Sequence, residues 1–420
     1  MDSMRFIGDF HIHSHYSRAT SKDMNIEELD KWARIKGVAV LGTGDFTHPQ
    51  WFRELEEKLE PAEDGLFKFK RGDSPIRFIL TVEVSSIYSQ ANQVRRIHNI
   101  VFAPSFEAAR KINRRLGDVG NLRADGRPIL GLPAHELLKI VLDVSEDCLL
   151  VPAHAWTPWF SVFGSKSGFD SIEECFGDLS RYIYAIETGL SSDPSMNWRL
   201  SALDNITLIS NSDCHSARRI GREANILEGG ELNYKNIIDA IKRKKSPLKL
   251  VETVEFYPEE GKYHYDGHRD CKVSLAPKES HKINGLCPNC GRPMTIGVLS
   301  RVEELADRRE GYMPKNAVPF RSLVPLDEII GEALGIGPQT KGVAKQYNNL
   351  IEVFGSEFNI LLEARIKKVE SASLPEISEA LRRVRDGELY IEPGYDGEYG
   401  KVKIFKDGER RSIKEQGALF

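Results

Sequence analysis

Three histidines stand at alternate positions near the start of the sequence, within GDFHIHSHYSRA at residues 8–19. Side chains on a β-strand alternate between its two faces, so His11 and His13 would point to the same side, about 6–7 Å apart. Two imidazoles at that separation can share a metal cluster. The spacing therefore predicts metal-ion chemistry at the end of an N-terminal strand.

Further carboxylates and imidazoles follow other apolar runs, in GTGDF, TVEVS, RIHNI, VPAHAW, AIETG and SNSDCHS. In a barrel of alternating strands and helices, the carboxyl ends of the strands surround one mouth, where such side chains converge. Glu187, in AIETG, belongs to this convergent set. The predicted ligands of the catalytic metals are His11, His13, Asp45, Glu83, His98, His154, Asp213 and His215.

Two or three divalent ions held in this way can acidify a bound water, neutralise a phosphodiester and stabilise the leaving oxygen. Histidine and carboxylate ligands suit zinc, with magnesium or manganese as alternatives, because affinity alone does not select among these metals. We assign Asp213 and His215 to the catalytic group. Asp193, in ETGLSSDPS, is either a further ligand or general base, or the cap of a following helix.

A second metal site is predicted from paired HxxC and CxxC spacings in HRDC and LCPNCGRP. This is the pattern of a structural zinc site with four protein ligands and no open position, which supports folding or docking rather than catalysis. His264 or His281 are alternatives for the histidine ligand. The predicted ligands of one structural zinc are His268, Cys271, Cys287 and Cys290.

The elements that must position these ligands follow from the apolar pattern of residues 1–245. GVAVLGTGD, IRFILTVEV, IHNIVFAP, CLLVPAHAW, IYAIETGL and ITLISNSDCH are typical of buried parallel strands. NIEELDKWARIKG and NYKNIIDAIKRKK carry apolar residues at helical spacing, and Gly37 closes the first. The sequence therefore predicts an α/β fold with a β/α barrel over residues 1–245.

The composition changes after Pro247. Residues 246–315 are rich in glycine, proline and metal ligands, which predicts a small zinc-binding module. From Leu326 onward, LDEIIGEALG, FNILLEARIKKV and PEISEALRRVRDGEL are helical patterns, with Pro375 at the start of the last. We expect residues 316–420 to form a mainly helical C-terminal domain with a flexible tail.

The ligand types occur in an order and spacing that resemble a known family. DFHIHS, an aspartate after the second strand, VEV, two further histidines and the closing SDCHS resemble the polymerase and histidinol phosphatase (PHP) domain over residues 5 to about 245. The resemblance implies a distorted (β/α)7 PHP barrel that holds up to three divalent metals for phosphoester hydrolysis.

Two positions depart from the PHP pattern. Where the family commonly has Thr-Asp-His, this chain has Gly44, Asp45 and Phe46, so His48 is the candidate substitute for the missing ligand. Arg18 stands where an acidic residue usually follows the HxH motif. The number of catalytic metals is therefore left open.

Two further segments flank the metal ligands. ARRIGRE directly follows SDCHS, where arginines would position a DNA phosphate without reading sequence. The tryptophans of HAWTPWF follow a predicted ligand, and they either stack on a base taken out of a duplex or pack under a loop. The predicted substrate-binding residues are Trp156, Trp159, Arg218, Arg219 and Arg222.

The order of the three parts gives a second resemblance, over nearly the whole chain. A PHP barrel followed by HRDC and CPNC, then GVLSRVEELADR and a helical tail, resembles the endonuclease Q family of archaeal DNA-repair nucleases. The resemblance implies a metal-dependent endonuclease that binds damaged double-stranded DNA. It implies nicking on the 5′ side of deaminated bases (hypoxanthine, uracil, xanthine) and of abasic sites.

Two other functions remain open. A histidinol-phosphatase-like enzyme for small phosphomonoesters is favoured by the net charge of −4, but it does not need the residues beyond the barrel. A non-cleaving adaptor that binds damaged DNA is suggested by Phe46, which stands in place of a metal ligand. Divalent-ion content and hydrolysis of a monoester would separate these alternatives.

Composition limits the remaining function classes. The chain has 40% hydrophobic and 29% charged residues and shows no apolar run of about 18 residues, so we expect no membrane role. The absence of an export leader and the metal-like cysteine spacing predict a cytoplasmic location. The terminal KEQGALF resembles the start of a sliding-clamp peptide, and a disordered tail is the alternative.

Overall fold

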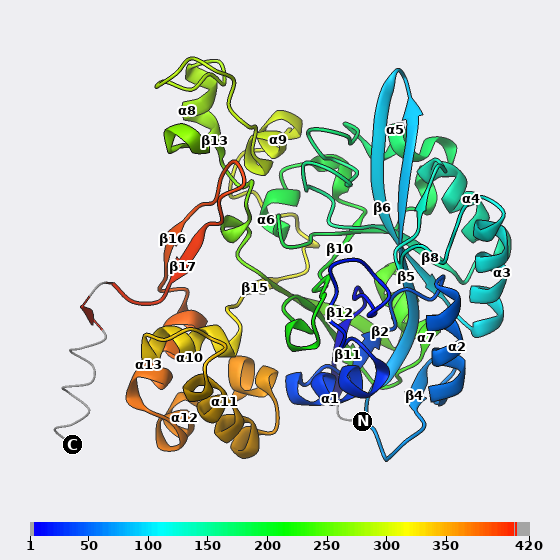
Figure 1. Ribbon diagram of the computed structural model, residues 1–420, viewed down its shortest axis with the longest axis horizontal. Helices are drawn as coiled ribbons and strands as arrows, with labels where there is room; N and C mark the ends of the chain where they lie inside the picture. Colours follow the sequence, from blue (N-terminus) through cyan, green and yellow to red (C-terminus); the bar gives the residue numbers. More distant parts are fainter. Residues whose placement is uncertain (1–3, 407, 410–420) are drawn as a thin grey trace.

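The computed structural model describes residues 4–406 and 408–409. Its largest part is a curved sheet surrounded by helices, and a long hairpin and a group of C-terminal helices extend from it (Figure 1). The strands of this part are β1 (Met4–Asp9), β2 (Val40–Gly42), β3 (Leu59–Pro61), β4 (Phe67–Phe69), β5 (Arg77–Gln90), β6 (Gln93–Ala103), β7 (Ile129–Leu130), β8 (Leu149–Pro152), β9 (Ala185–Glu187), β10 (Thr207–Ile209), β11 (Ala224–Gly229), β12 (Leu248–Glu255) and β15 (Phe320–Ser322).

The strands close into a barrel through two sheets. The main sheet runs in the order β15-β12-β11-β1-β2-β5-β4-β3, with β6 beside β5 and β8 beside β6. The parallel pair β9 and β10 links β8 to β11. The Ala155 amide, after β8, donates to the carbonyl oxygen of Glu187 in β9 at 2.9 Å. The Ser210 amide, after β10, donates to the side chain of Asn225 in β11 at 3.1 Å.

The predicted strands form, but they are not all parallel. β5 and β6 make a long antiparallel hairpin, in which Leu80 pairs with Ala103 and Gln90 with Gln93. Only Ala91 and Asn92 join these strands, with φ of 51° and 60°. A two-residue link with positive φ at both positions makes a hairpin, whereas a parallel crossover needs a dozen or more residues. The prediction of parallel strands is wrong for this pair.

The central strands are buried on both faces. In β2, Val40 and Leu41 belong to two different buried apolar groups. In β5, Phe78 and Ile79 divide in the same way. Strands covered on both sides read as continuous apolar runs rather than as alternating patterns, which is why these segments could be recognised from the sequence.

The first helix of the barrel ends at the predicted glycine. In α1 (Ile26–Lys36), the Asn25 side chain accepts from the Glu28 amide, and Gly37 ends the helix with φ 85°. The predictions of α1 and α7 are confirmed. The other helices of this part are α2 (Pro49–Lys58), α3 (Phe106–Gly117), α4 (Ala134–Val144), α5 (Ile172–Phe176), α6 (Pro194–Asn197) and α7 (Tyr234–Ile241).

The main sheet continues past residue 245. β12 pairs with β11, and β15 returns from much later in the chain to pair with β12. The proposed division into residues 1–245, 246–315 and 316–420 therefore stays a prediction. The elements between and after these strands are β13 (Asp266–His268), β14 (Val273–Leu275), α8 (Pro277–Lys282), α9 (Val298–Leu305), α10 (Leu326–Leu334), α11 (Lys341–Phe354), α12 (Ile366–Ala372), α13 (Pro375–Asp386), β16 (Tyr390–Glu392) and β17 (Lys401–Lys403).

Of the three segments predicted to be helices in the C-terminal region, two form as predicted and the third is interrupted. α10 and α13 are confirmed, with Pro375 in the first turn of α13. The segment FNILLEARIKKV forms a π-helical turn at Asn359–Glu363 and then α12 instead of one helix. Arg385 of α13 donates to the carbonyl oxygens of Leu361 at 2.9 Å and Ala364 at 2.7 Å, and it thereby satisfies the backbone where the helix breaks.

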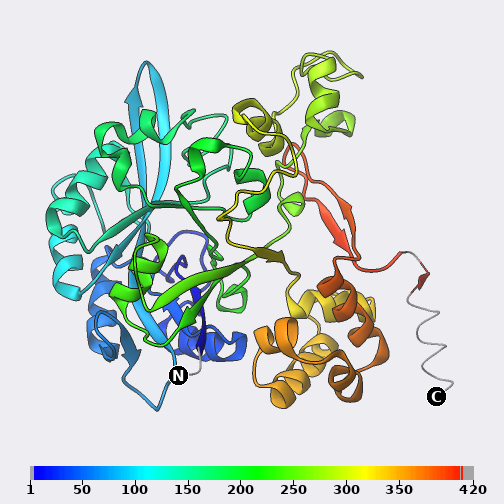
Figure 2. The same cartoon turned by 180° about the vertical axis from the view of Figure 1, so that it is seen from behind.

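A buried ion pair joins α1 to the segment that follows α11. In Figure 2 the orange C-terminal helices lie beside the blue N-terminal part of the chain. Lys36 Nζ lies 2.6 Å from Glu357 Oε2, and both side chains are buried. Glu357 also accepts from the Tyr347 hydroxyl at 2.5 Å and from the Leu326 amide at 3.1 Å. The Glu357 carboxylate therefore accepts from three donors, which offset part of the desolvation cost of a buried pair.

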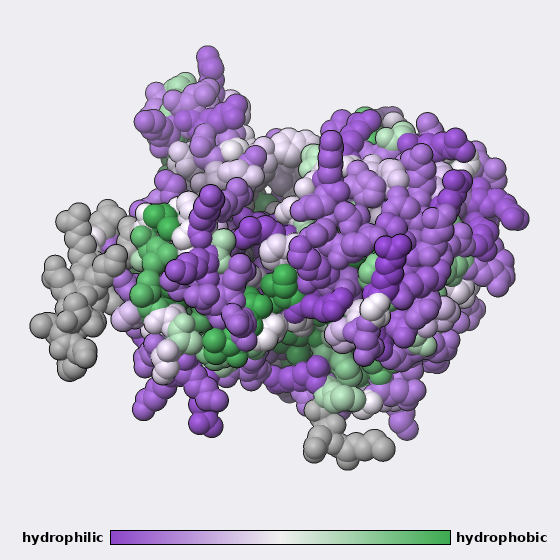
Figure 3. Space-filling view, turned by 60° about the horizontal axis from the view of Figure 1, so that its bottom comes forward, coloured by the Kyte–Doolittle hydropathy of each residue, from purple (hydrophilic) through white to green (hydrophobic). Residues whose placement is uncertain are grey.

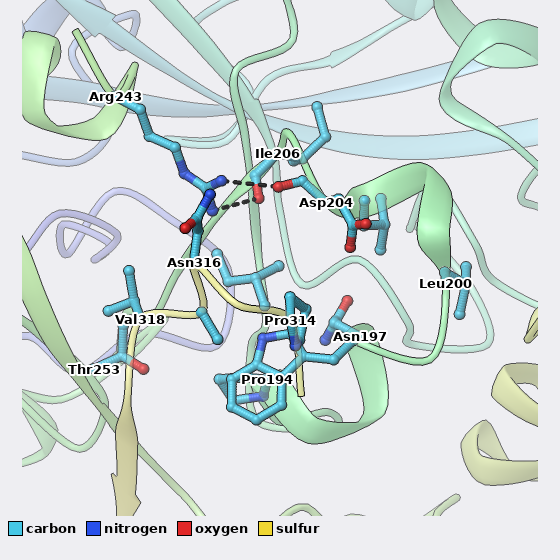
Figure 4. Close-up of a pocket in the computed structure, with 14 residues that line it drawn as sticks. Pro194, Asn197, Leu200, Asp204, Ile206, Arg243, Thr253, Pro314, Asn316 and Val318 are labelled. Carbon is cyan, nitrogen blue, oxygen red and sulfur yellow. Dashed lines mark hydrogen bonds between the residues drawn. The ribbon is translucent and has the colours of Figure 1, made fainter. Parts of the chain in front are cut away.

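One face of the molecule and one small pocket are shown in Figures 3 and 4. The face in Figure 3 is mostly hydrophilic, and its hydrophobic side chains gather mainly on the side of the C-terminal helices. Figure 4 shows a pocket of about 20 Å³ in which Arg243 donates to the carbonyl oxygens of Asp204 and Ile206. Within the described residues, no helix is both long and apolar enough to cross a bilayer.

Candidate metal centre

Four ligand atoms meet at the mouth of the barrel. Atoms of His11, His13, Glu83 and Asp213 all lie within 4.8 Å of one another. His13 Nε2 is 3.0 Å from Asp213 Oδ1 and 3.2 Å from Glu83 Oε2. His11 Nε2 is 3.6 Å from Asp213 Oδ1. These four side chains, which we call donor group A, come from segments far apart in the sequence.

A carboxylate lies behind each histidine of donor group A. His11 Nδ1 is 3.0 Å from Glu187 Oε1, and His13 Nδ1 is 3.1 Å from Asp45 Oδ1. A carboxylate at Nδ1 fixes the tautomer that leaves Nε2 free as a metal ligand. Asp45 was predicted as a ligand, but here it orients His13.

Three buried atoms of donor group A fit a bound cation. His11 Nε2, His13 Nε2 and Asp213 Oδ1 have no hydrogen-bond partner among the described residues. Buried polar atoms are otherwise almost always paired, because an unpaired one costs free energy. An imidazole nitrogen and a carboxylate oxygen that face one another without hydrogen bonds are the donor set of a divalent metal site.

A second group, donor group B, shares one carboxylate with the first. Its members are Glu83, His98 and His154, with ligand atoms again within 4.8 Å of one another. Glu83 Oε1 lies 2.6 Å from His98 Nδ1 and 3.0 Å from His154 Nε2. Glu83 Oε2 faces donor group A, so the two oxygens of this carboxylate face different donor groups, and Glu83 would serve both if each held a metal ion.

The electrostatics of the site favour positive charge. Burial alone lowers the pKa of His11, but the carboxylates of Glu187, Asp213 and Glu83 outweigh burial and raise this pKa well above its usual value. Burial alone raises the pKa of Glu83, but His98, Arg127 and His11 hold it well below the usual range. The carboxylates therefore stay ionised in a buried site, where a metal cation would neutralise them.

Three residues at the mouth have strained backbones. Asp45, His154 and Asp213 have φ of 49°, 30° and 45°, in the left-handed region that non-glycine residues rarely adopt. Such conformations persist only where the surrounding structure holds them, and they cluster at functional sites. Here Asp45 contacts His13, Asp213 belongs to donor group A, and His154 belongs to donor group B.

The other predicted residues near the mouth lie outside both donor groups. His215 Nδ1 is 2.9 Å from the Asp213 carbonyl oxygen, and its ring lies 4.5 Å from that of His13. His48 is buried and stacks on Tyr16, so no contact shows it in the place of the missing family histidine. Asp193 caps α6 by accepting from the Met196 amide at 2.8 Å. This is the helix-capping role that was the alternative to a ligand or general base.

Two of the three predicted arginines face the C-terminal helices. Arg219 pairs with Glu328 of α10 at 2.5 Å. Arg218 lies 3.9 Å from Asp327, and Arg222 covers the ring of Phe256. Each guanidinium thus contacts another side chain of this chain, and the predicted contact with DNA phosphate stays a prediction.

The two predicted tryptophans differ in exposure. Trp156 is fully buried, and its indole N–H donates to Asn197 Oδ1 at 2.8 Å, so the packing alternative describes it. Trp159 instead lines an open cleft of about 590 Å³. The cleft also contains the donor-group residues His98 and His154.

Arg127 is a site residue that the sequence did not reveal. It lines the same cleft and donates to Glu83 Oε2 at 3.0 Å. It comes from the loop before β7, in GRPIL, where no motif marks it. Only the folded chain brings this guanidinium beside a residue 44 positions earlier.

The predicted zinc ligands come together. The ligand atoms of His268, Cys271, Cys287 and Cys290 lie within 4.8 Å of one another, and Cys290 Sγ is 3.8 Å from His268 Nδ1. The alternative histidine His264 lies elsewhere, stacked on Tyr265. This Cys/His cluster is a four-ligand metal site by its donor set.

Nearly the whole chain matches solved structures. The lesion-specific endonuclease PfuEndoQ from Pyrococcus furiosus is 33% identical, with a TM-score of 0.86 and coverage of 96% of both chains. This chain belongs to the endonuclease Q family. A structure of endonuclease Q in complex with a 27-mer duplex substrate, with an abasic lesion at the active site, is also 33% identical. Its TM-score is 0.84, over 96% of this chain and 98% of that one.

The sequence comparisons match further proteins. The family model described as the MJ0043 C-terminal domain matches residues 325–388. The uncharacterized protein MJ0043 of Methanocaldococcus jannaschii is 35% identical over 290 residues, or 66% of this chain. This chain spans only 35% of the length of that relative. The match to endonuclease Q confirms the predicted α/β fold with a PHP barrel.

Proposed function

We propose that this chain is a metal-dependent DNA endonuclease that nicks duplexes at lesions. One observation carries the proposal. In a member of the endonuclease Q family, two donor groups that share Glu83 lie beside an open cleft. Adjacent divalent-ion sites of this kind serve in-line displacement at phosphorus without a covalent nucleophile.

The two donor groups would hold divalent ions, zinc or alternatively magnesium or manganese. Ions bound there would supply a hydroxide at neutral pH and neutralise phosphoryl charge. The chain's own part is to present ligand atoms in fixed directions. Glu187 and Asp45 hold the Nδ1 atoms of His11 and His13, and this turns both Nε2 atoms toward Asp213.

Asp213 and His215 are assigned to the reaction itself. Asp213 supplies a ligand oxygen to donor group A. Burial lowers the pKa of His215, so the imidazole is neutral at pH 7 and can accept a proton. Its Nδ1 is engaged by the Asp213 carbonyl oxygen, which leaves Nε2 as the atom for a metal or a substrate proton.

The cleft supports a nucleotide substrate. Metal-ligand histidines lie beside Trp159 and Phe160, and Arg96, Arg127 and Lys262 supply positive charge. Such a cleft suits a phosphodiester next to an apolar, planar group. We assign as lesions the abasic site and the deaminated bases hypoxanthine, uracil and xanthine, with the nick on their 5′ side.

The Cys/His cluster is assigned one structural zinc. With four protein ligands, a zinc ion held there would have no open position for a substrate. The predicted sliding-clamp peptide at residues 415–420 lies outside the described residues and stays a prediction.

The test uses an end-labelled duplex with a single hypoxanthine or abasic site, beside an undamaged duplex. The chain should nick both damaged duplexes directly 5′ of the lesion with a divalent ion present, and a chelator should abolish the nick. Hydrolysis of a small phosphomonoester without any nicking would point to a phosphatase. Lesion binding without cleavage across zinc, magnesium and manganese would point to an adaptor.

A further inference from the structure

The cleft beside the donor groups has walls from two parts of the chain. Trp159 comes from the loop after β8, and Tyr263 comes from the segment that leads into the Cys/His cluster. Their rings meet edge to face, with centroids 5.4 Å apart and planes at 74°. Both side chains are partly exposed in the cleft. An aromatic wall of this kind contacts planar groups through stacking and apolar contact.

Tyr263 is fixed from the side of the Cys/His cluster. Its carbonyl oxygen accepts from the Val298 amide, the first residue of α9, at 2.7 Å. Gly267 and Thr295 exchange two backbone hydrogen bonds, at 2.8 and 3.0 Å. A Cβ on Gly297 would lie 2.4 Å from the Tyr265 carbonyl carbon, so only glycine permits this close approach. The segment that carries Tyr263, just before β13, is thus held against the end of the metal-binding module.

The metal ligands lie at the far end of the same backbone ladder. His268 directly follows Gly267 on β13, and Cys290 lies on the chain that returns toward Thr295. When a metal joins these ligands, the two sides of the ladder are tied together. The position of Tyr263 in the cleft then depends on a site that does not itself contact the cleft.

We propose that Tyr263 is a specificity-determining residue that contacts the damaged base, and that the Cys/His cluster acts on base selection by holding Tyr263 against Trp159. The inference rests on the proposed function. On this inference, the zinc-binding module helps to recognise the lesion and does not take part in cleavage. An abasic site has no base to contact, so the two kinds of lesion should respond differently to loss of the Tyr263 ring.

Binding is measured in the Asp213→Asn background, which separates affinity from cleavage. Fluorescence anisotropy would give Kd for duplexes with hypoxanthine, with an abasic site, and without damage. Tyr263→Ala should weaken hypoxanthine binding roughly 5-fold to 100-fold, the size of one lost base–aromatic contact. It should leave abasic-site binding almost unchanged, and Tyr263→Phe should keep both affinities.

Tyr265→Ala is the matched control. Tyr265 lies two residues later on the same segment but lines a different pocket, beside His264. Its loss should not change the ratio of hypoxanthine to abasic affinity. An equal loss for both lesions in Tyr263→Ala, or no loss, would overturn the inference. A parent protein without any lesion preference would instead refute the proposed function and this inference with it.

The link to the metal is tested by a double-mutant cycle. Cys290→Ser should lower the bound metal at the module and weaken hypoxanthine binding by about the same factor as Tyr263→Ala. Because both changes act through one side chain, the double variant should bind no worse than either single variant. Additive losses would show that the module acts on DNA by another route, and would overturn the coupling.

Discussion

Asp45 Oδ1 lies 3.1 Å from His13 Nδ1, and the second oxygen of Asp45 accepts from the Ser14 amide and the Ser17 hydroxyl at 2.7 and 2.8 Å. The Ser14 hydroxyl also donates to this second oxygen, at 2.7 Å, so the carboxylate is held from the side opposite the imidazole. Burial raises the pKa of Asp45, but the positive charge of His13 and the hydrogen bonds outweigh burial and leave this pKa below its usual value. Asp45 is therefore an anion at neutral pH, and it fixes His13 with Nε2 toward donor group A.

Replacing Asp45 should weaken metal binding without removing a ligand. Asp45→Ala removes the acceptor that fixes the His13 tautomer, and loss of such a partner typically costs about 10-fold to 100-fold in metal affinity. Competition with a chromogenic chelator would measure this. The surface change Asp118→Ala should have no effect, and an unchanged affinity in Asp45→Ala would refute the orienting role.

Glu83 should matter to both metal positions because both donor groups contain it. Glu83→Gln removes the bridging charge, so bound metal should fall at both positions. Nicking should drop by about a thousandfold, since metal ions supply several kcal/mol of transition-state stabilisation. Elemental analysis and single-turnover cleavage would measure these effects. His98→Ala is the comparison, because it removes a ligand from donor group B alone.

The sequence predicted the ligands better than their roles. His11, His13, Glu83 and Asp213 could be recognised because each follows an apolar run whose end faces the mouth of the barrel. The sequence alone does not distinguish a carboxylate that binds a metal from one that orients a histidine ligand. Asp45 shows the difference only once the fold places it at Nδ1 of His13.

Long-range packing limited the other predictions. Trp156 is a residue type that can stack on a base. Its indole N–H instead donates to Asn197, 41 positions later, in the core. Arg219 lies shortly after the predicted metal ligands, yet its guanidinium donates to Glu328, 109 positions later. Neither partner is marked by a local motif. The strand pairing of β5 and β6 was missed because Ala91 and Asn92 lack the glycine that usually signals a tight hairpin.

The buried pair of Lys36 and Glu357 should contribute strongly to stability. Lys36→Ala leaves the Glu357 carboxylate buried without its cation, and breaking a buried pair in this way costs about 3–5 kcal/mol. Urea denaturation would give the change in the free energy of unfolding. The exposed pair of Lys31 and Glu28 provides the control, because Lys31→Ala should cost about 0.5 kcal/mol or less. Equal effects of the two changes would contradict the prediction.

Glu255 should make stability depend on pH. Burial raises the pKa of Glu255 to about 7, although hydrogen bonds from Thr253, Thr188 and Ser210 act in the opposite direction. The nearby Glu223 has a pKa well above the usual value for the same main reason, burial. The folded state therefore holds a proton on Glu255 that the unfolded chain releases near pH 4.5. Stability is fully present below that pH and falls as the pH rises toward 7.

Glu255→Gln should remove this dependence, because the amide stays neutral at every pH and keeps the shape of the protonated acid. At pH 8 the variant should be more stable than the parent chain by on the order of 1–3 kcal/mol, while at pH 4.5 the two should be nearly equal. Urea denaturation at both pH values would measure the difference. Glu252→Gln, on the same strand and paired with Arg321 near the surface, is the control and should not change the slope. A parent chain whose stability rises between pH 5 and pH 7 at the same rate as that of Glu255→Gln would show that Glu255 is ionised in the folded state.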